Sequence, residues 1–151
     1  MNRAWLVGQN DASIVGEGWY DRMPDFFGLP FRESFPRATL RFDDLIAGEK
    51  ISFVLGSAFA LHESCQQVRI RIGKETWERE MRPPLPQTGW QAITVVVPAG
   101  TKQTEVILET DGWRHGDYED IADFREVGFL LGGVFIQRRA GFPTRRDEAT
   151  G

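Results

Sequence analysis

The sequence predicts an all-β protein built as a two-sheet antiparallel β-sandwich with a jelly-roll-like arrangement. From residue 37 onward, apolar and polar residues alternate with a period of two in several segments, which places the apolar side chains on one face of each strand. About eight or nine short candidate strands follow one another along the chain at a spacing of roughly 8–12 residues, separated by turns that contain glycine or proline. No segment shows the apolar stripe of a long amphipathic helix. Strands with one apolar face bury that face against a second sheet, which gives the sandwich.

The N-terminal part begins with two short candidate strands. Residues 4–7 are apolar and end at a turn sequence, GQND. Residues 13–20 also predict a strand, although Gly16 and Gly18 interrupt it. A glycine inside a strand usually marks a bulge or a bend, so we expect one here.

The next segment, residues 21–36, predicts a long connection. It contains three prolines and four phenylalanines. Proline favours turns and loops, whereas a solvated loop has no need of four large apolar rings. We therefore expect this connection to lie against an edge of the core.

The middle of the chain carries the clearest strand patterns. Apolar residues alternate with charged or polar ones over residues 38–42, 51–55 and 68–72. Gly73 then predicts a hairpin turn into a further strand at residues 76–78.

The C-terminal half predicts three more strands. Residues 81–89 are excluded from a central strand, because their three prolines lack ladder donors. Residues 90–97 form a nearly continuous β-branched run that suits a strand buried on one or both faces. Residues 104–109 resume the alternation, and residues 129–136 form a final apolar strand.

The length bounds the domain organisation. A chain of 151 residues suffices for one domain with a proper core. We expect this domain to cover residues 1–140. Residues 141–151 contain little to bury and predict a flexible C-terminal tail.

The charge and the cysteine content restrict the partners and the location. The net charge of −4 gives no electrostatic reason to expect nucleic acid or an acidic membrane as a partner. No window approaches the roughly 18 apolar residues of a membrane span, and residues 1–13 lack the apolar core of a secretory signal. The single cysteine, Cys65, excludes an intrachain disulfide. A cytoplasmic location is the default expectation, although a domain excised from an exported chain would look the same.

The densest group of candidate binding residues precedes the last strand. Within 13 residues the chain gathers two aromatic rings, two carboxylates and a guanidinium. They are Trp113, Asp117, Tyr118, Asp120 and Arg125. A sugar ring stacks its C–H face on Trp or Tyr, while its hydroxyls seek charged and amide partners, so this composition suits a glycan site. Trp19 and Tyr20 are further candidates for the same contact surface.

Each of these candidates also has a structural interpretation. A Trp in a sandwich usually belongs to the core or covers a sheet edge. Arg125 has a planar donor fork that suits a ligand, but it could instead pin the acidic loop by pairing with Asp117 or Asp123. Gly128 predicts a bend or a close backbone approach.

No cofactor is expected, with one alternative left open. The carboxylates of residues 111–123 are dense enough for a Ca²⁺ site, since Ca²⁺ takes several oxygen ligands from loops. Their spacing does not match the EF-hand pattern. A solvated acidic loop explains the same residues without a metal.

The sequence favours a non-catalytic protein. His62 and His115 do not have metal-ligand spacing, and the chain contains no nucleophile elbow, P-loop or dinucleotide-binding glycine motif. Paired carboxylates for glycoside hydrolysis depend on a separation in space that the sequence does not show. A small sugar-active enzyme therefore remains an alternative.

Several short motifs occur in an order that resembles one family. They are Gly18-Trp19-Tyr20, Phe31-Arg32, residues 38–42, the VRIRIG strand at 68–73, Trp90 ahead of the VVVP sequence, and DFREVG at 123–128. This order resembles the small jelly-roll, carbohydrate-binding-module-like domains found beside bacterial glycosyltransferase and polysaccharide-biosynthesis domains.

The resemblance spans residues 16–136 and implies a β-sandwich with a glycan-related role. The expected partner is a glycan or a glycan-processing protein, to which the chain would be an accessory module. The alternative is a structural or protein-interaction subunit that packs a sheet face or edge on another protein or on itself as a homo-oligomer, because sandwich edges can pair.

Overall fold

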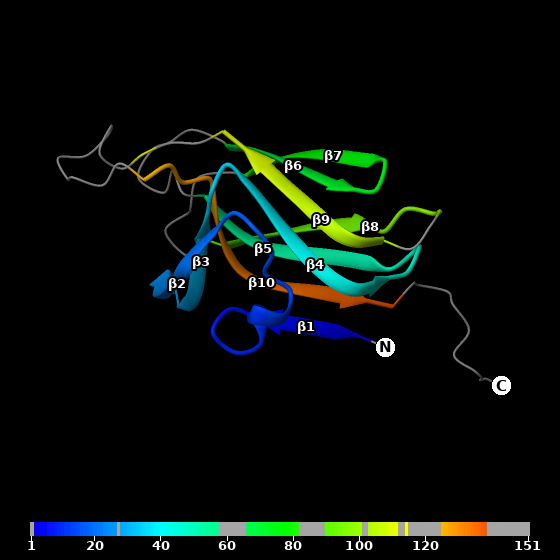
Figure 1. The fold of residues 1–151 in the computed structure, drawn as a ribbon, viewed down its shortest axis with the longest axis horizontal. Helices are drawn as coiled ribbons and strands as arrows, with labels where there is room; N and C mark the ends of the chain where they lie inside the picture. Colours follow the sequence, from blue (N-terminus) through cyan, green and yellow to red (C-terminus); the bar gives the residue numbers. More distant parts are fainter. Residues whose placement is uncertain are drawn as a thin grey trace.

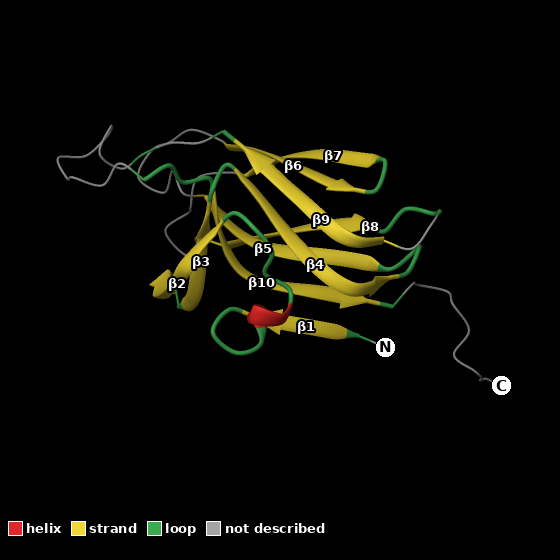
Figure 2. Ribbon diagram, in the orientation of Figure 1, coloured by secondary structure: helices red, strands yellow, loops and turns green. Residues whose placement is uncertain are grey.

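The computed structural model describes residues 2–26, 28–57, 66–81, 90–100, 103–111, 114 and 125–138. Within these residues the chain forms ten strands and a single three-residue 3₁₀ helix, η1 (Asp11–Ser13), as Figure 2 shows. The strands are β1 (Arg3–Leu6), β2 (Trp19–Phe26), β3 (Leu29–Ser34), β4 (Arg37–Leu45), β5 (Lys50–Ser57), β6 (Gln66–Ile72), β7 (Glu75–Met81), β8 (Trp90–Val96), β9 (Gln103–Thr110) and β10 (Phe129–Gln137). The all-β prediction is confirmed.

The strands form two antiparallel sheets packed face to face (Figure 1). The larger sheet has six strands in the order β2-β3-β10-β5-β8, with β1 also paired to β10. The smaller sheet has four strands in the order β4-β9-β6-β7. Consecutive strands such as β3 and β4, or β4 and β5, lie in different sheets, so the chain crosses repeatedly between the layers. This is the predicted two-sheet sandwich.

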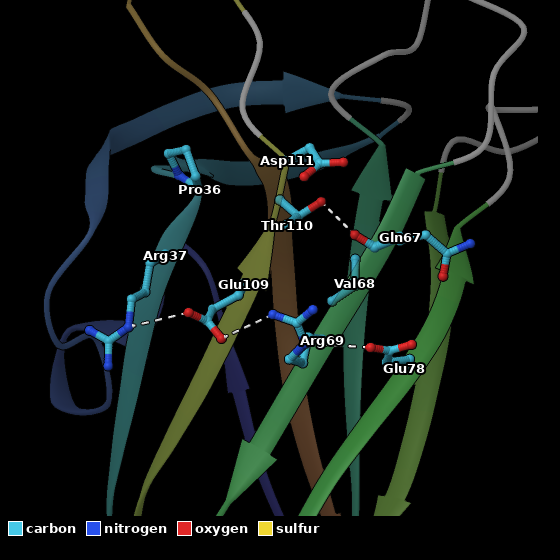
Figure 3. Close-up of a pocket in the computed structure, with 9 residues that line it drawn as sticks. All are labelled: Pro36, Arg37, Gln67, Val68, Arg69, Glu78, Glu109, Thr110 and Asp111. Atoms are coloured by element: carbon cyan, nitrogen blue, oxygen red, sulfur yellow. Dashed lines mark hydrogen bonds and ion pairs between the residues drawn. The ribbon is translucent and has the colours of Figure 1, made fainter.

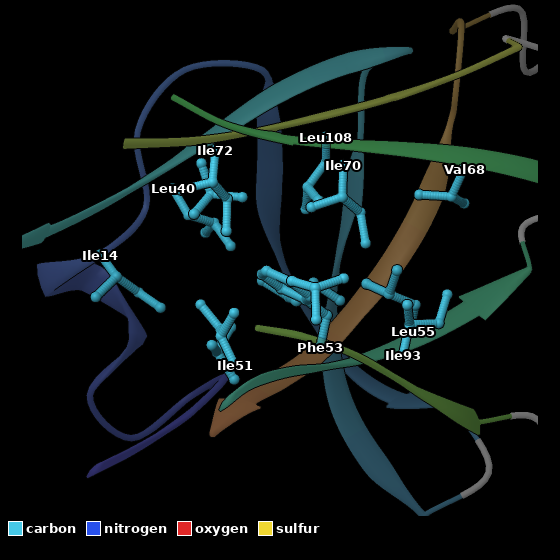
Figure 4. Close-up of a cluster of buried hydrophobic side chains, with 14 of the residues drawn as sticks. Ile14, Leu40, Ile51, Phe53, Leu55, Val68, Ile70, Ile72, Ile93 and Leu108 are labelled. Atoms are coloured by element: carbon cyan, nitrogen blue, oxygen red, sulfur yellow. The ribbon is translucent and has the colours of Figure 1, made fainter. Parts of the chain in front are cut away.

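The core fills the space between the two sheets (Figure 4). Burial alternates along β6, where Val68, Ile70 and Ile72 are fully buried. They face the larger sheet, whose Phe53 and Leu55 are also fully buried. Burying one such side chain stabilises the fold by about 1.5–3 kcal/mol. The period-two pattern in the sequence therefore produces the packing that holds the sheets together.

The segment predicted as a long connection is a β-hairpin instead. Residues 21–36 contain most of β2 and all of β3, which pair with each other. Proline did not prevent this, because β2 lies at the edge of the larger sheet and edge strands tolerate a missing donor. Strand β3 pairs with β10 only through Arg32 and Glu33, which leaves Pro30 outside that ladder.

The predicted strand at residues 13–20 is also wrong in its first part. Helix η1 ends at Ser13, Val15 forms an isolated bridge with Leu40, and β2 starts at Trp19. Gly18 has a positive φ of 88°, a backbone conformation that favours glycine and ends any regular strand at this point.

The remaining strand predictions agree with the structure. The predicted hairpin at Gly73 joins β6 to β7, and the final apolar run forms β10. Among the described residues, no helix is long and apolar enough to span a membrane. The predicted tail at 141–151 lies outside the described residues.

Candidate functional site

The described residues that flank the predicted recognition segment lie at one end of the sandwich. Strand β9 ends at Thr110, and the chain returns to the described structure at Arg125, shortly before β10. The buried side chain of Gln66 joins the two points, because its amide donates to Thr110 Oγ1 at 3.1 Å and to the carbonyl oxygen of Gly128. We call this end of the molecule the loop end.

An aromatic stack lies at the loop end beside the larger sheet. The rings of Tyr20 and Phe35 are nearly parallel, with their centroids 4.5 Å apart and an interplanar angle of 14°. The guanidinium carbon of Arg125 lies 4.8 Å from the centroid of the Tyr20 ring. The Tyr20 hydroxyl donates to the carbonyl oxygen of Glu126 at 2.8 Å. We call Tyr20, Phe35 and Arg125 the aromatic stack.

The geometry of the stack decides which ring is open to a ligand. One face of Tyr20 carries Phe35 and a guanidinium lies over the ring as well, an arrangement in which stacking and cation–π attraction both contribute. Phe35 is 42% exposed to solvent. The apolar surface that this stack offers to a ligand therefore comes mainly from Phe35.

A buried carboxylate orients the guanidinium of the stack. Arg125 Nη2 lies 3.0 Å from Glu33 Oε1, and the side chain of Glu33 is only 8% exposed. Arg125 itself is 43% exposed, so it faces solvent while its partner does not. A charged donor held in this way loses less conformational freedom on binding than a free arginine side chain. Within the described residues Arg125 pairs with Glu33 of β3, whereas Asp117 and Asp123, the two partners predicted from the sequence, lie outside them.

Trp19 and Tyr20 are consecutive in β2 and point to opposite faces of the sheet. The indole N–H of Trp19 donates to the carbonyl oxygen of Thr39 at 2.8 Å. Its ring meets Phe129 edge-on, with centroids 5.8 Å apart, and it packs partly buried against the main core. The structure thus brings Tyr20 and Arg125 together and places Trp19 away from them, where the core interpretation fits its contacts.

The other sequence candidates stay predictions. Trp113, Asp117, Tyr118 and Asp120 lie outside the described residues. Sequence reasoning missed Glu33 and Phe35, which fall in the segment interpreted as a connection. The only available signal for them was the excess of phenylalanine in that segment.

A hollow adjoins the loop end on the outer face of the smaller sheet (Figure 3). Its volume is about 450 Å³. A row of alternating charges crosses it, with Glu109 lying 3.6 Å from Arg37 and 3.7 Å from Arg69, and Arg69 lying 3.5 Å from Glu78. No aromatic ring lines it. It offers paired charges and no stacking surface, so the aromatic stack is the better candidate for contact with a sugar ring.

The part of the chain that the structure describes contains no candidate metal site. Among the residues it describes, no group of three or more His, Cys, Asp or Glu side chains is placed to hold a metal ion. Most of the carboxylates behind the calcium alternative fall in residues 115–124, outside the described part.

The strand arrangement is that of jelly-roll β-sandwiches, the fold of known carbohydrate-binding modules. The C-terminal family 6 module of LamC, a marine laminarinase from Zobellia galactanivorans, matches with a TM-score of 0.53 and 10% identity over 91% of this chain and 100% of the module. The family 35 module from Clostridium thermocellum matches with a TM-score of 0.53 and 10% identity over 90% and 98% of the two chains.

A third similar structure is a family 6 module of lichenase 5A from Cellvibrio mixtus in complex with cellotriose. It matches with a TM-score of 0.51 and 11% identity over 90% of this chain and 96% of the module. The sequence matches no protein-family model and no curated protein. At these identities the likeness shows the fold.

Proposed function

We propose that this chain is a non-catalytic glycan-binding module. The observation that carries the proposal is its likeness, over about nine-tenths of its length, to whole carbohydrate-binding modules of families 6 and 35. One of the similar modules holds cellotriose. The match covers 96–100% of the length of these three modules.

The loop end is the surface we assign to the glycan. The exposed ring of Phe35 suits the C–H face of a sugar, and Arg125 presents donors held in place by Glu33. Trp113, Asp117, Tyr118 and Asp120 complete the proposed surface, because their segment begins and ends beside the stack. Aromatic platforms with a few fixed polar groups are the usual composition of a small-molecule site.

We assign this chain the role of an accessory module that acts beside a glycan-processing enzyme. The motifs in its sequence resemble those of modules that accompany glycosyltransferases. In that role the module would hold a glycan near a separate catalytic domain. Co-purification with enzymes of that class, followed by loss of the complex when the loop end is altered, is the measurement that bears on this point.

Replacing Phe35 or Trp113 with alanine is expected to weaken glycan binding by about tenfold, which corresponds to roughly 1.4 kcal/mol. The physical reason is loss of a stacking surface for the sugar ring. A glycan array identifies the ligand, and isothermal titration measures the dissociation constants. The bound oligosaccharide should be recovered intact, as expected of a non-catalytic module.

The matched control is Phe135→Ala. Phe135 is a phenylalanine of similar exposure, 36%, near the far end of β10. The substitution Phe135→Ala should leave the dissociation constant for the glycan unchanged. If no glycan binds, or if Phe135→Ala weakens binding as much as Phe35→Ala at unchanged melting temperature, the assignment of the loop end is wrong.

A further inference from the structure

Strand β8 lies at an edge of the larger sheet. In the described part of the chain it pairs with β5 alone. The backbone N–H of Val97 donates to the carbonyl oxygen of Glu49 at 2.8 Å, and the carbonyl oxygen of Val97 accepts from the N–H of Gly48 at 2.9 Å, so both backbone groups of Val97 point toward the chain that leads into β5. The direction of these groups alternates from one residue to the next along an antiparallel strand. The N–H and C=O groups of Ala92, Thr94 and Val96 consequently point away from β5, toward the open edge.

The side chains of these three residues are exposed on the outer face of the larger sheet, and Val96 keeps 48% of its surface in solvent. Sequence and topology together thus leave three outward-pointing donors, three outward-pointing acceptors and uncharged side chains along one strand. A strand edge of this kind, which has no partner strand among the described residues, is a template for another strand.

The other edge strands are protected and β8 is not. Natural proteins guard open edges with charged side chains, proline or very short strands. Strands β7, β4 and β2 carry several charged residues each, β2 also contains a proline, and β1 is four residues long and begins with an arginine. Strand β8, with the sequence WQAITVV, contains no charge and no proline. This contrast indicates that pairing at β8 is tolerated or used.

We propose that β8 pairs antiparallel with β8 of a second copy of this chain, about a two-fold axis at Thr94. This register places Thr94 opposite its own copy and Ala92 opposite Val96 of the second copy. All three outward-pointing residues then form hydrogen-bonded pairs, each of which exchanges two N–H···O bonds. The two larger sheets become one continuous sheet.

The chemistry of the strand selects a second copy as the occupant. An uncharged strand matches an uncharged partner, and in this register no charged side chains are brought opposite each other. Thr–Thr pairs across strands are favourable, and the small Ala92 opposite the larger Val96 keeps the packing even. A two-fold axis also closes the assembly, because it uses the β8 edge of each copy.

Sedimentation velocity of the full chain over a concentration series tests the proposal. We expect a monomer–dimer equilibrium in which Thr94→Lys weakens dimerisation about tenfold or more, because it places two lysines opposite each other on the axis. Where Thr94→Lys does not fold, Ala92→Lys serves in its place. The control is Ser52→Lys, which adds the same charge one strand inward on the same face and should leave the dimer intact.

Amide exchange gives a second readout that needs no substitution. The amides of Ala92, Thr94 and Val96 should become protected as the concentration rises, whereas those of Ile93 and Val95, bonded to β5, should be protected at all concentrations. A chain that stays monomeric up to its solubility limit would overturn the proposal. A dimer that Ser52→Lys dissociates and Thr94→Lys does not would also overturn it, since that result would show packing through the sheet face.

Discussion

The substitution Gly18→Ala is expected to lower the free energy of unfolding by about 3–5 kcal/mol, a large share of the roughly 5–15 kcal/mol that stabilises a typical domain. Two effects add at this position. Gly18 has a φ of 88°, where an L side chain is strained. A Cβ there would lie 2.2 Å from the carbonyl oxygen of Arg37 and 2.8 Å from the Cα of Ala38. Both neighbours are backbone atoms of β4, so relief requires moving a strand.

Two other glycines separate the two effects. Gly28 has nearly the same φ, 89°, but nothing lies within 4 Å of an added Cβ, so Gly28→Ala should cost only about 1–2 kcal/mol of strain. At Gly16, where φ is not positive, a Cβ would lie 2.3 Å from Thr39 Oγ1 and 2.9 Å from its carbonyl oxygen. Gly16→Ala should therefore show the crowding alone, about 1–3 kcal/mol.

Urea unfolding followed by tryptophan fluorescence measures all three variants. The expected order of destabilisation is Gly18→Ala first, then Gly16→Ala, then Gly28→Ala. If Gly18→Ala is no less stable than Gly28→Ala, the close approach of Gly18 to β4 does not exist in solution. Gly18 also accepts a hydrogen bond from the N–H of Phe35 at 2.8 Å, so Gly18→Ala should weaken glycan binding as well.

The strands with a regular period were predictable because one local property decides them. In β6 every second side chain is apolar, and every second side chain is buried. The same holds for β5 around Phe53. Gly128 was predicted to mark a bend or a place where two backbone segments approach closely. A Cβ at this position would lie 2.6 Å from the carbonyl oxygen of Phe35. These features depend only on residues that are neighbours in the sequence, or on a single glycine that lacks a side chain.

The features that could not be predicted depend on where a strand lies in the sheet. Prolines in residues 21–36 argued against strands, but whether a proline is tolerated depends on which neighbour needs its N–H. That is a property of the strand order, which places β2 at an edge and lets β3 meet β10 over a short stretch. The pair Arg125–Glu33 joins residues far apart in the sequence, and no spacing rule connects them. Two of the three residues of the aromatic stack, Tyr20 and Arg125, were therefore predicted from composition, and the third, Phe35, was found only from the fold.

The second large effect is expected at a buried ion pair. Asp11→Ala should destabilise the fold by about 3 kcal/mol, at the lower end of the range for removing one partner of such a pair. The carboxylate of Asp11 pairs with the guanidinium of Arg32, and their side chains are only 7% and 19% exposed. Asp11 also accepts a hydrogen bond from the N–H of Gly8 at 3.0 Å. The substitution would leave a nearly buried guanidinium without its carboxylate and free the turn that precedes η1.

Two comparisons isolate the contribution of burial. Arg41→Ala removes an ion pair with Glu105 whose side chains are 59% and 44% exposed, and should cost less than about 1 kcal/mol. The double substitution Asp11→Leu with Arg32→Met removes both buried charges, and should be more stable than Asp11→Ala alone, because apolar replacements of a buried pair are often nearly neutral. Chemical denaturation of the four proteins gives the required differences. Equal losses for Asp11→Ala and Arg41→Ala would contradict the buried pair.

This ion pair also connects stability to the candidate site. Arg32 donates to the carbonyl oxygen of Tyr20 at 3.2 Å, and the next residue along β3 is Glu33, which orients Arg125. Asp11 thus holds, through one arginine, both the strand that carries Tyr20 and the strand that carries Glu33. We expect Asp11→Ala to weaken glycan binding even at temperatures where the protein stays folded, whereas Arg41→Ala should leave the dissociation constant unchanged. Titration of both variants well below their melting temperatures distinguishes this positioning effect from a simple loss of folded protein.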